Sequence, residues 1–477
     1  MDELDLRHFL QASSPVSAQF WLLTVFLSVV FFTGGASRID VTSLLILRPF
    51  SVLACTIALV SLRREHMVGR LPLIVGFGAI VGLTTLHIIP LPPALWQALP
   101  GRQLQAEIGS LVSLGEVWRP LTLAPIDGFH ALASLSAPLA VLLFGIQLGQ
   151  NDLCRLLPLL IGFGALSGFL GVLQVNGDEF RSLYFYSVTN FGNPVGLFAN
   201  RNHAALLLAS LFPMLTAFVL TRVATAPITN LFVAVSLAIL LVPLILLNGS
   251  RSALMVTSFG MVGCVILYLR SIHLLPRIAS IEKPTSLILL ILFAVAIITW
   301  ITIYFSRAKS IDRLFELSAA NDGRRDFWTL SLSLAKQYFP WGSGSGSFAE
   351  TYQIVEPLRL LEPLYLNHAH NDWIEVMLTF GFPGVLLMFV ATIYFLWRLF
   401  PIWQKSIVQQ SNLRRQIITY GRMSSITIAM VGAASVTDYP LRTPIMMCVL
   451  AVWILWFLEA DRAIAFDMEG RVSALAR

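Results

Sequence analysis

Long apolar segments, separated by short polar ones, follow one another along nearly the whole chain. A helix needs roughly 20 mostly apolar residues to cross the hydrocarbon core of a bilayer. By this measure the sequence predicts about twelve spanning helices, and the expected fold class is an all-α polytopic membrane protein. The predicted spans lie near residues 19–35, 43–61, 71–90, 129–148, 154–174, 203–221, 228–247, 252–269, 285–305, 377–399, 422–437 and 441–458.

The composition supports a membrane protein. Hydrophobic residues make up 56% of the 477 residues and charged residues only 12%, whereas about a quarter of a typical soluble domain is charged. So much apolar surface needs lipid as its solvent, and the bilayer is therefore the first expected partner. The net charge of +6 does not indicate nucleic acid, because the basic residues fall between apolar runs and not on one face.

The basic residues of the short loops predict the orientation of the chain. Lys and Arg accumulate in alternate loops, for example at Arg63 and Arg70 and again at Arg414 and Arg415. Loops rich in these residues stay in the cytoplasm, so both termini are expected there. Three longer segments then lie on the opposite face, at about 91–128, 175–202 and 306–372.

The segment 306–372 is the largest of these outer segments. Its apolar residues from Phe327 to Tyr338 recur at helical spacing, which predicts one amphipathic helix. Pro340 and the alternating Gly/Ser run 342–347 then end that helix. We therefore expect a large outer loop that contains short helices.

Ionisable side chains are nearly absent from the middle of the predicted spans, where Arg48 is the exception. Ion-coupled transporters usually place carboxylates, histidines or arginines at midplane depth. The pattern therefore argues against a pump or secondary transporter and directs attention to the outer surface.

The densest polar cluster is the run Asn367-His368-Ala369-His370-Asn371-Asp372, where the long loop re-enters the membrane. Three interpretations are open. An imidazole, with an unperturbed pKa of about 6.5, is a suitable general base near neutral pH. His368, His370 and Asp372 could instead bind a metal ion, because an extended strand would direct both imidazoles to one face. The run could also simply cap the following helix.

Several arginines lie at predicted outer helix ends or loop boundaries. They are Arg201, Arg251, Arg324 and Arg325. A guanidinium binds phosphate oxygens in bidentate fashion, and a helix N-terminus adds partial positive charge for anions. A single such arginine more often extends to lipid headgroups or pairs with a nearby acid. Several of them on the face where positive charge is disfavoured predict a diphosphate site.

The segment that starts at His370 resembles a motif of the bacterial O-antigen ligase family, which also includes polymerases of lipid-linked glycans. His370-Asn371 is followed, after nine residues, by Gly381-Phe382-Pro383-Gly384, and this order matches the family pattern. Further matching segments precede it in the chain, at Phe198–Asn202, Gly249–Arg251, Arg324 with Trp328, and Trp341–Phe348.

The resemblance covers about residues 190–440. It implies three parts of the chain. These are N-terminal transmembrane helices (1–189), a catalytic region that includes the periplasmic loop 306–372 (190–440), and a last transmembrane helix with a cytoplasmic tail (441–477).

The resemblance implies an inverting membrane glycosyltransferase of the GT-C type on the periplasmic face of the bacterial inner membrane. Its donor would be a glycan on undecaprenyl diphosphate, and its acceptor a hydroxyl of lipid A–core or of a growing glycan chain. No metal or other cofactor is implied, because arginines can stabilise the charge that develops on a diphosphate leaving group. An O-antigen ligase and a surface polysaccharide polymerase share the motif. The alternative from another class is a polysaccharide flippase or exporter without catalytic activity.

The resemblance also assigns roles to residues. His370 would deprotonate the acceptor hydroxyl, and Arg251 and Arg324 would bind the diphosphate. Supporting residues are expected at Arg201, Asn202, Arg325, His368, Asn371, Glu375, Asp438 and Arg442. One position departs from the family, since many members have a glutamate where this chain has Thr379. Glu375, one helical turn earlier, is the candidate for an orienting role in its place.

Overall fold

The computed structural model describes residues 15–175, 181–222, 227–271, 324–361, 365–406 and 410–475. The N-terminal half contains α2 (Ala18–Thr33), α3 (Leu44–Val60), α4 (Arg64–Met67), α5 (Leu71–Leu86), α6 (Pro93–Gln97), α7 (Gln103–Leu111), α8 (Pro125–Ser134), α9 (Ser136–Gly145), α10 (Gln150–Gln174) and α11 (Arg201–Thr221). After these come α12 (Pro227–Leu247), α13 (Arg251–Leu269), α16 (Arg324–Tyr338), α17 (Phe348–Gln353), η4 (Leu358–Leu360), α18 (Asp372–Gln404), α19 (Asn412–Ala434), η5 (Pro440–Arg442) and α20 (Pro444–Leu475). The strands β1 (Pro90–Leu91) and β2 (Arg119–Pro120) pair antiparallel, with Leu91 opposite Arg119.

Most predicted spans coincide with helices. Eight described segments are long and apolar enough to cross a membrane: α8 with α9, α10, α11, α12, α13, α18, α19 and the first part of α20. The shorter apolar helices α2, α3 and α5 match three more predicted spans. The predicted span at 285–305 lies outside the described residues. The all-α membrane class is therefore confirmed, whereas the count of twelve and the GT-C type stay predictions.

The boundaries of several spans differ from the predicted ones. The helix α19 was expected near 422 and begins at Asn412, where the Ser411 hydroxyl accepts a hydrogen bond from the Arg414 backbone N–H (3.4 Å). A hydropathy pattern detects only the apolar part of a helix, so a polar first turn escapes it. The helix α20 likewise continues well beyond the predicted end near 458.

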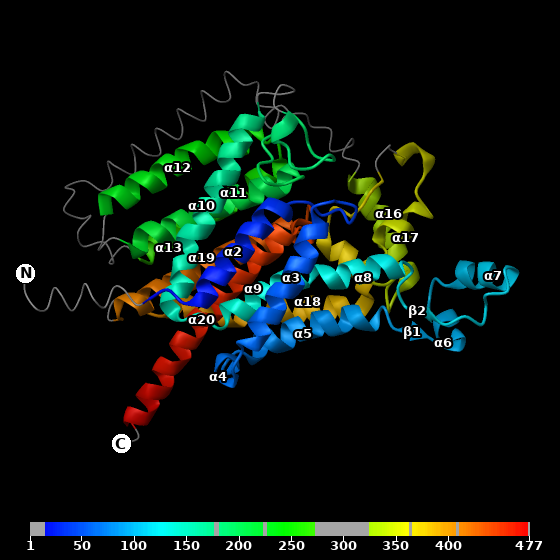
Figure 1. Cartoon of the computed structure of the whole chain (residues 1–477), viewed down its shortest axis with the longest axis horizontal. Helices are drawn as coiled ribbons and strands as arrows, with labels where there is room; N and C mark the ends of the chain where they lie inside the picture. Colours follow the sequence, from blue (N-terminus) through cyan, green and yellow to red (C-terminus); the bar gives the residue numbers. More distant parts are fainter. Residues whose placement is uncertain are drawn as a thin grey trace, which may run out of the picture.

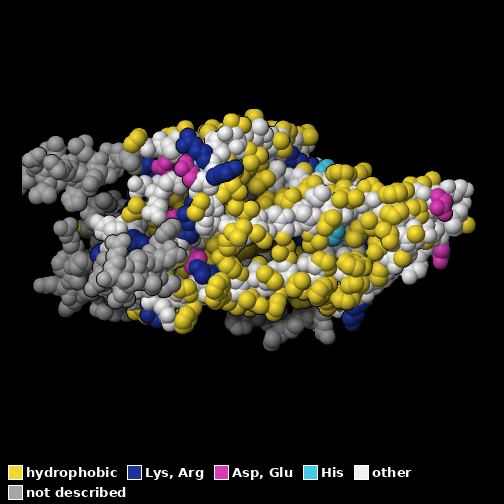
Figure 2. Space-filling view, turned by 90° about the horizontal axis from the view of Figure 1, so that it is seen from below, with side chains coloured by type: hydrophobic (Ala, Val, Ile, Leu, Met, Phe, Trp, Pro, Cys, Tyr) yellow, Lys and Arg dark blue, Asp and Glu magenta, His cyan; other side chains and the backbone are white. Residues whose placement is uncertain are grey.

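The centre of the bundle is formed by α11, α19 and α20. In each of these helices 78% of the residues in the membrane-spanning stretch are buried. The helix α11 packs against α10, α12, α13 and α19, and α19 packs along α20. By contrast, only 22–28% of the residues in the membrane-spanning stretches of α12, α13 and α18 are buried. Figure 2 shows hydrophobic side chains over a broad belt of one face, with few charged side chains within it. Such a surface suits contact with lipid.

The two ends of the bundle have different structures. Figure 1 shows α6, α7 and the β1–β2 pair projecting from one end, together with α16 and α17, while the end of α20 projects from the other. At the latter end Arg70 pairs with Glu459 (3.4 Å) and donates to the Ile146 carbonyl. The described parts of two predicted outer segments therefore lie at one end, and the predicted inner residue Arg70 lies at the other. The assignment of these ends to cytoplasm and periplasm stays a prediction.

The helix α16 confirms the amphipathic helix expected in the large loop. It ends at Tyr338, just before Pro340, and Leu334 and Tyr338 are buried in a small outer core with Phe348, Tyr352 and Leu378. Hydrophobic burial at helical spacing thus anchors the outer segment on the first turns of α18.

The helix α18 is broken at Gly381, the first glycine of the predicted motif. Gly381 has a φ of +59°, a conformation that glycine adopts at little cost. The break frees the carbonyls of Leu378 and Thr379, which accept the N–H groups of Ser343 (2.8 Å) and Gly344 (2.9 Å). The Gly/Ser run is therefore more than a turn, because it replaces the missing helical hydrogen bonds of α18.

The same run continues to a second element. The Leu123 backbone N–H donates to the Ser343 carbonyl (3.0 Å), and the Ser345 N–H donates to His87 Nδ1 (3.0 Å). Ser343, Ser345 and Ser347 are fully buried. The run 342–347 thus connects the first part of α18 to the segments around residues 87 and 123.

Candidate active site

His370 lies in the short segment that leads into α18. Its φ of +51° falls in the left-handed region, which is rare for residues other than glycine. Its neighbours hold it there. The Ala369 N–H donates to Glu375 Oε2 (2.9 Å), and the Asp372 N–H donates to the Ser435 carbonyl (2.9 Å). A conformation of this kind persists where surrounding contacts enforce it, and such positions concentrate at functional sites.

Asn371 is the N-cap of α18. Its Oδ1 accepts hydrogen bonds from the backbone N–H groups of Trp373 (3.0 Å) and Ile374 (3.1 Å). The capping interpretation of the polar run is therefore correct for this residue. It does not compete with a chemical role for His370, because the cap uses the neighbouring side chain.

Glu375 is the centre of a buried ionic network. Its Oε1 lies 2.9 Å from His368 Nδ1 and 3.3 Å from an Arg442 guanidinium nitrogen. Arg442 Nε also contacts Asp372 Oδ1 (3.1 Å), and the Ser435 hydroxyl donates to Asp372 Oδ2 (3.0 Å). Buried charges need such partners, since an uncompensated ion is costly in a medium of low polarity. Arg442 thus joins η5 to the start of α18.

Asp438 lies just before η5, close to the start of α11 and to the segment that leads into α18. Its Oδ1 is 3.6 Å from His370 Nδ1 and 3.6 Å from His203 Nε2. The Asn202 amide donates to Oδ2, and the backbone N–H of Tyr439 donates to Oδ1 (2.9 Å). Burial raises the pKa of this carboxyl, but the two facing imidazoles outweigh it and leave the pKa well below its usual range. Asp438 is therefore ionised.

Tyr439 separates the three histidines. Its ring centroid lies 5.1 Å from that of His203, 4.6 Å from His368 and 4.8 Å from His370. Burial raises the pKa of the phenol, so this side chain stays neutral. The ring therefore fixes the imidazoles by packing and adds no charge of its own.

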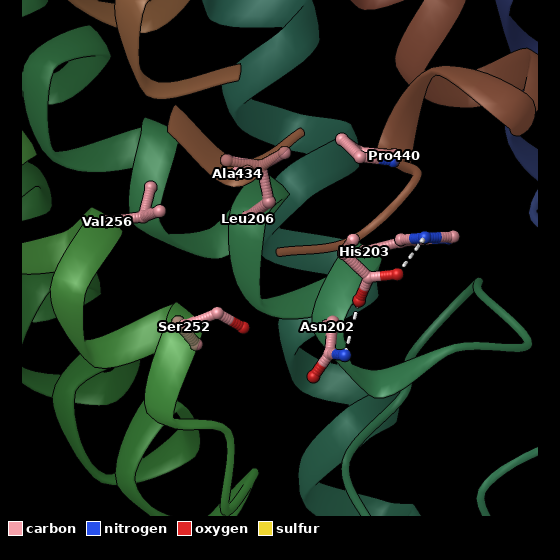
Figure 3. Close-up of a pocket in the computed structure, with 9 residues that line it drawn as sticks. Asn202, His203, Leu206, Ser252, Val256, Ala434 and Pro440 are labelled. Atoms are coloured by element: carbon pink, nitrogen blue, oxygen red, sulfur yellow. Dashed lines mark hydrogen bonds and ion pairs between the residues drawn. The ribbon is translucent and has the colours of Figure 1, made fainter. Parts of the chain in front are cut away.

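A pocket opens beside this cluster, between α11, α13 and α19 (Figure 3). It is a small recess with room for about one water molecule. In Figure 3 Asn202 and His203 are directed towards one carboxylate, that of Asp438. Ser252 lies across the pocket at the start of α13, and Val256 one turn further along that helix. The polar side chains thus converge from α11, α13 and the α19–α20 connection.

Arg251 is the first residue of α13 and directly precedes Ser252, which lines the pocket. Its side chain is exposed. The Asn248 amide donates to the Arg201 carbonyl (2.8 Å), so the starts of α13 and α11 are fixed side by side. Arg201 contributes its backbone to this junction, while its guanidinium donates to Asn193 (3.4 Å).

The structure describes the backbone of α16 from Arg324 onward, and the side chains of Arg324 and Arg325 lie outside the described part of the chain. Their expected roles stay predictions. The helix α16, which carries both residues, packs against α18 and forms part of the outer core described above.

The metal interpretation required the side chains of His368, His370 and Asp372 to converge on one metal ion. Instead they contact different partners, namely Glu375, Asp438 and Arg442. The backbone at His370 is left-handed, so the extended strand on which that interpretation depended is not formed. Among the described residues no group of three His, Cys, Asp or Glu side chains could hold a metal ion.

Two residues of this cluster were not among the predicted site residues. His203 directly follows the segment Phe198–Asn202, and Tyr439 lies between Asp438 and Pro440. Adjacency to predicted site residues was the only sequence feature that could have indicated them. An imidazole can accept a proton at one nitrogen while a carboxylate orients the other. The cluster therefore has the parts of a general base.

Comparison with protein families identifies a known domain in part of the chain. No curated protein matches the chain. Residues 235–390 match the family model described as O-antigen ligase. That range contains Arg251, Arg324, His370 and the motif up to Gly384, whereas Asn202, His203 and Asp438 lie outside it. The chain therefore carries an O-antigen ligase domain, which relates it to the O-antigen ligase and polymerase family.

Proposed function

We propose that this protein is a glycosyltransferase that transfers a glycan from undecaprenyl diphosphate to an acceptor hydroxyl, with His370 as the general base. The O-antigen ligase domain and the spanning helices support a membrane enzyme of O-antigen or polysaccharide biosynthesis. The observation that carries the finer proposal is the contact of His370 Nδ1 with the ionised Asp438 (3.6 Å) beside a pocket.

The exposure of the histidines favours His370 as the base. Its side chain is 24% exposed, whereas that of His203 is 1% exposed. Nδ1 of His370 faces Asp438, and Nε2 is then the nitrogen that takes the proton. In uncomplexed sites such contacts are often longer than a hydrogen bond and tighten when substrate binds.

The transfer step is a direct displacement. The acceptor hydroxyl gives its proton to His370 Nε2 while its oxygen bonds to the anomeric carbon of the donor sugar. The bond between that carbon and the diphosphate oxygen breaks, and the electron pair leaves with undecaprenyl diphosphate. Attack opposite the leaving group inverts the anomeric configuration. Arg251 and Arg324 stabilise the charge that develops on the diphosphate.

The lining of the pocket offers both kinds of surface, polar and apolar, that a donor lipid would need. Asn202 and Ser252 lie at helix starts, and Leu206 and Val256, one turn deeper in the same helices, are apolar. We assign the polar level to the diphosphate and the apolar level to the first part of the prenyl chain. Anchoring both parts would hold the anomeric carbon near His370.

The orientation and the acceptor follow from the same assignment. The basic loops predict that the site faces the periplasm across the inner membrane. The acceptor is then a hydroxyl of lipid A–core for a ligase, or of a growing glycan chain for a polymerase. Glycan analysis of a deletion strain separates these, because loss of the lipopolysaccharide ladder with intact core indicates a ligase. Loss of secreted polysaccharide, or a ladder reduced to one repeat, indicates a polymerase.

The variant His370→Ala in a reconstituted transfer assay tests the proposal. Removal of a general base is expected to lower the rate by roughly 10²–10⁴-fold. His66→Ala is the matched control, since His66 has a similarly exposed side chain (23%) at the opposite end of the bundle. Undiminished transfer by His370→Ala would exclude the catalytic role and favour an exporter, which forms no glycosidic bond.

A further inference from the structure

His203 is a buried imidazole that the proposed transfer step does not use. It lies in the first turn of α11, lines the pocket and is 1% exposed. Neither of its ring nitrogens has a hydrogen-bond partner among the described residues, and its contact with Asp438 is an ion-pair distance of 3.6 Å. A buried polar group is costly without a partner, so this position calls for an explanation.

The explanation lies in how Asp438 Oδ1 is shared. A carboxylate oxygen has two lone-pair sites. The Tyr439 backbone N–H occupies one of them at 2.9 Å. His203 Nε2 and His370 Nδ1 both lie 3.6 Å from the same oxygen, so the two imidazoles face one remaining acceptor site.

We propose that His203 is a positioning residue that competes with His370 for Asp438 and thereby limits how strongly the carboxylate acts on the base. This inference rests on the proposed function, in which His370 is the base. In this assignment His203 acts on the base through the carboxylate that both imidazoles face.

The direction of the effect follows from electrostatics. A carboxylate close to an imidazole stabilises the protonated form and raises its pKa. A histidine that is already protonated cannot act as a base. When His203 donates to Asp438, less of the carboxylate's charge is available to the imidazolium form of His370.

The charged groups with contacts beside the cluster are Glu375 and Asp372 from α18, His368 from the segment before it, and Arg442 from η5. Arg38, whose charge acts on Tyr439, is paired with Asp40 (2.7 Å). Glu375 and Asp372 are held by Arg442, and Glu375 also by His368. The contact between His203 and Asp438 therefore determines how much of the carboxylate's charge acts on His370.

The pH dependence of transfer by His203→Phe and His203→Gln tests this competition. Phenylalanine keeps the ring contact with Tyr439 and removes the donor, whereas the glutamine amide retains one. For His203→Phe the limb on which kcat/KM rises with pH is expected to move upward by about one pH unit, with the rate recovering at higher pH. His203→Gln should keep the limb of the native protein.

A fall of the rate by one factor at every pH, with the limb unmoved, would show a merely structural role and overturn the inference. The proposed function would survive that result, because it depends on His370→Ala measured in the same assay. If His203→Phe does not yield folded protein by size-exclusion chromatography, His203→Met removes the donor with a flexible side chain, and the same two outcomes apply to it.

Discussion

Gly381 and Pro340 are in direct backbone contact across the break in α18. The Phe382 N–H donates to the Pro340 carbonyl (2.7 Å), and a Cβ on Gly381 would lie 2.1 Å from that oxygen. The motif glycine therefore has a structural purpose. It allows the outer segment to dock into α18, and this docking holds the first turns of the helix, with His370 before them, in place.

Gly381→Ala is accordingly expected to destabilise the protein and to lower transfer more than tenfold. Alanine meets both the steric conflict with Pro340 and an unfavourable positive φ of +59°. Thermal unfolding in detergent and the transfer assay measure the two effects. Gly76→Ala is the matched control, because nothing lies within 4 Å of a Cβ at Gly76. Equal stability of the two variants would contradict the structural purpose of Gly381.

The sequence predicts the spans well because the length of an apolar run is a local property that the bilayer thickness selects. The role of the run 342–347 is not local. Its alternation of glycine and serine indicates a turn, and that much is correct, but the carbonyls that it meets belong to Leu378 and Thr379, far along the chain. No periodicity within the run itself identifies those partners.

The site was predictable to the extent that motifs identify residues. His370, Asn202 and Asp438 were expected as site residues, and the structure brings them together. His203 was missed because a histidine in a helix start has no distinguishing pattern. Its partner is decided by how the start of α11 meets η5, which depends on the packing of the whole bundle.

Glu375 is expected to position the segment that carries His370. It accepts the Ala369 N–H (2.9 Å), whereas the Thr379 hydroxyl donates to the Glu375 carbonyl (2.7 Å). Glu375→Ala should lower kcat at least tenfold with little change in KM. Glu375→Gln keeps an acceptor for Ala369 and should recover part of the rate. A change confined to KM would instead indicate direct contact with substrate.

Arg442 is expected to contribute to stability and not to substrate binding, because Asp372 and Glu375 already occupy its guanidinium. Removing one partner from a buried ionic network costs about 3–5 kcal/mol. Arg442→Ala should therefore lower the free energy of unfolding markedly, and Arg442→Lys should recover only part of it, since an ammonium lacks the planar fork. Normal thermal stability of Arg442→Ala would reject this assignment.

Arg251 is expected to bind the donor diphosphate. Loss of one charged donor at a developing oxyanion typically lowers the rate by about 10²–10³-fold. Arg251→Ala should approach that loss, and Arg251→Lys should retain part of the activity as a point charge. Arg119→Ala is the control, because its guanidinium lies over the Trp96 ring (5.0 Å) in the β1–β2 region. Similar losses of transfer rate in both variants would indicate that positive charge attracts anionic lipid in general, without a specific diphosphate contact at Arg251.

The depressed pKa of Asp438 predicts how stability depends on pH. A carboxyl whose pKa is lower in the folded than in the unfolded protein stabilises the fold above its unfolded pKa, about 3.9 for aspartate. This stabilisation is lost as the pH falls from that value towards the folded pKa. Asp438→Asn removes the titrating group, so its melting temperature should fall less steeply than that of the native protein below about pH 4.

Asp438→Asn should also change catalysis in the direction opposite to His203→Phe. Without the carboxylate, the imidazolium form of His370 loses its stabilising partner. The rising limb of kcat/KM should therefore move to lower pH, with a maximum rate reduced at least tenfold because the imidazole loses the group that orients it. Measuring both variants across one pH range separates the two residues. A limb that moves upward in Asp438→Asn would show that the carboxylate does not face the base during transfer.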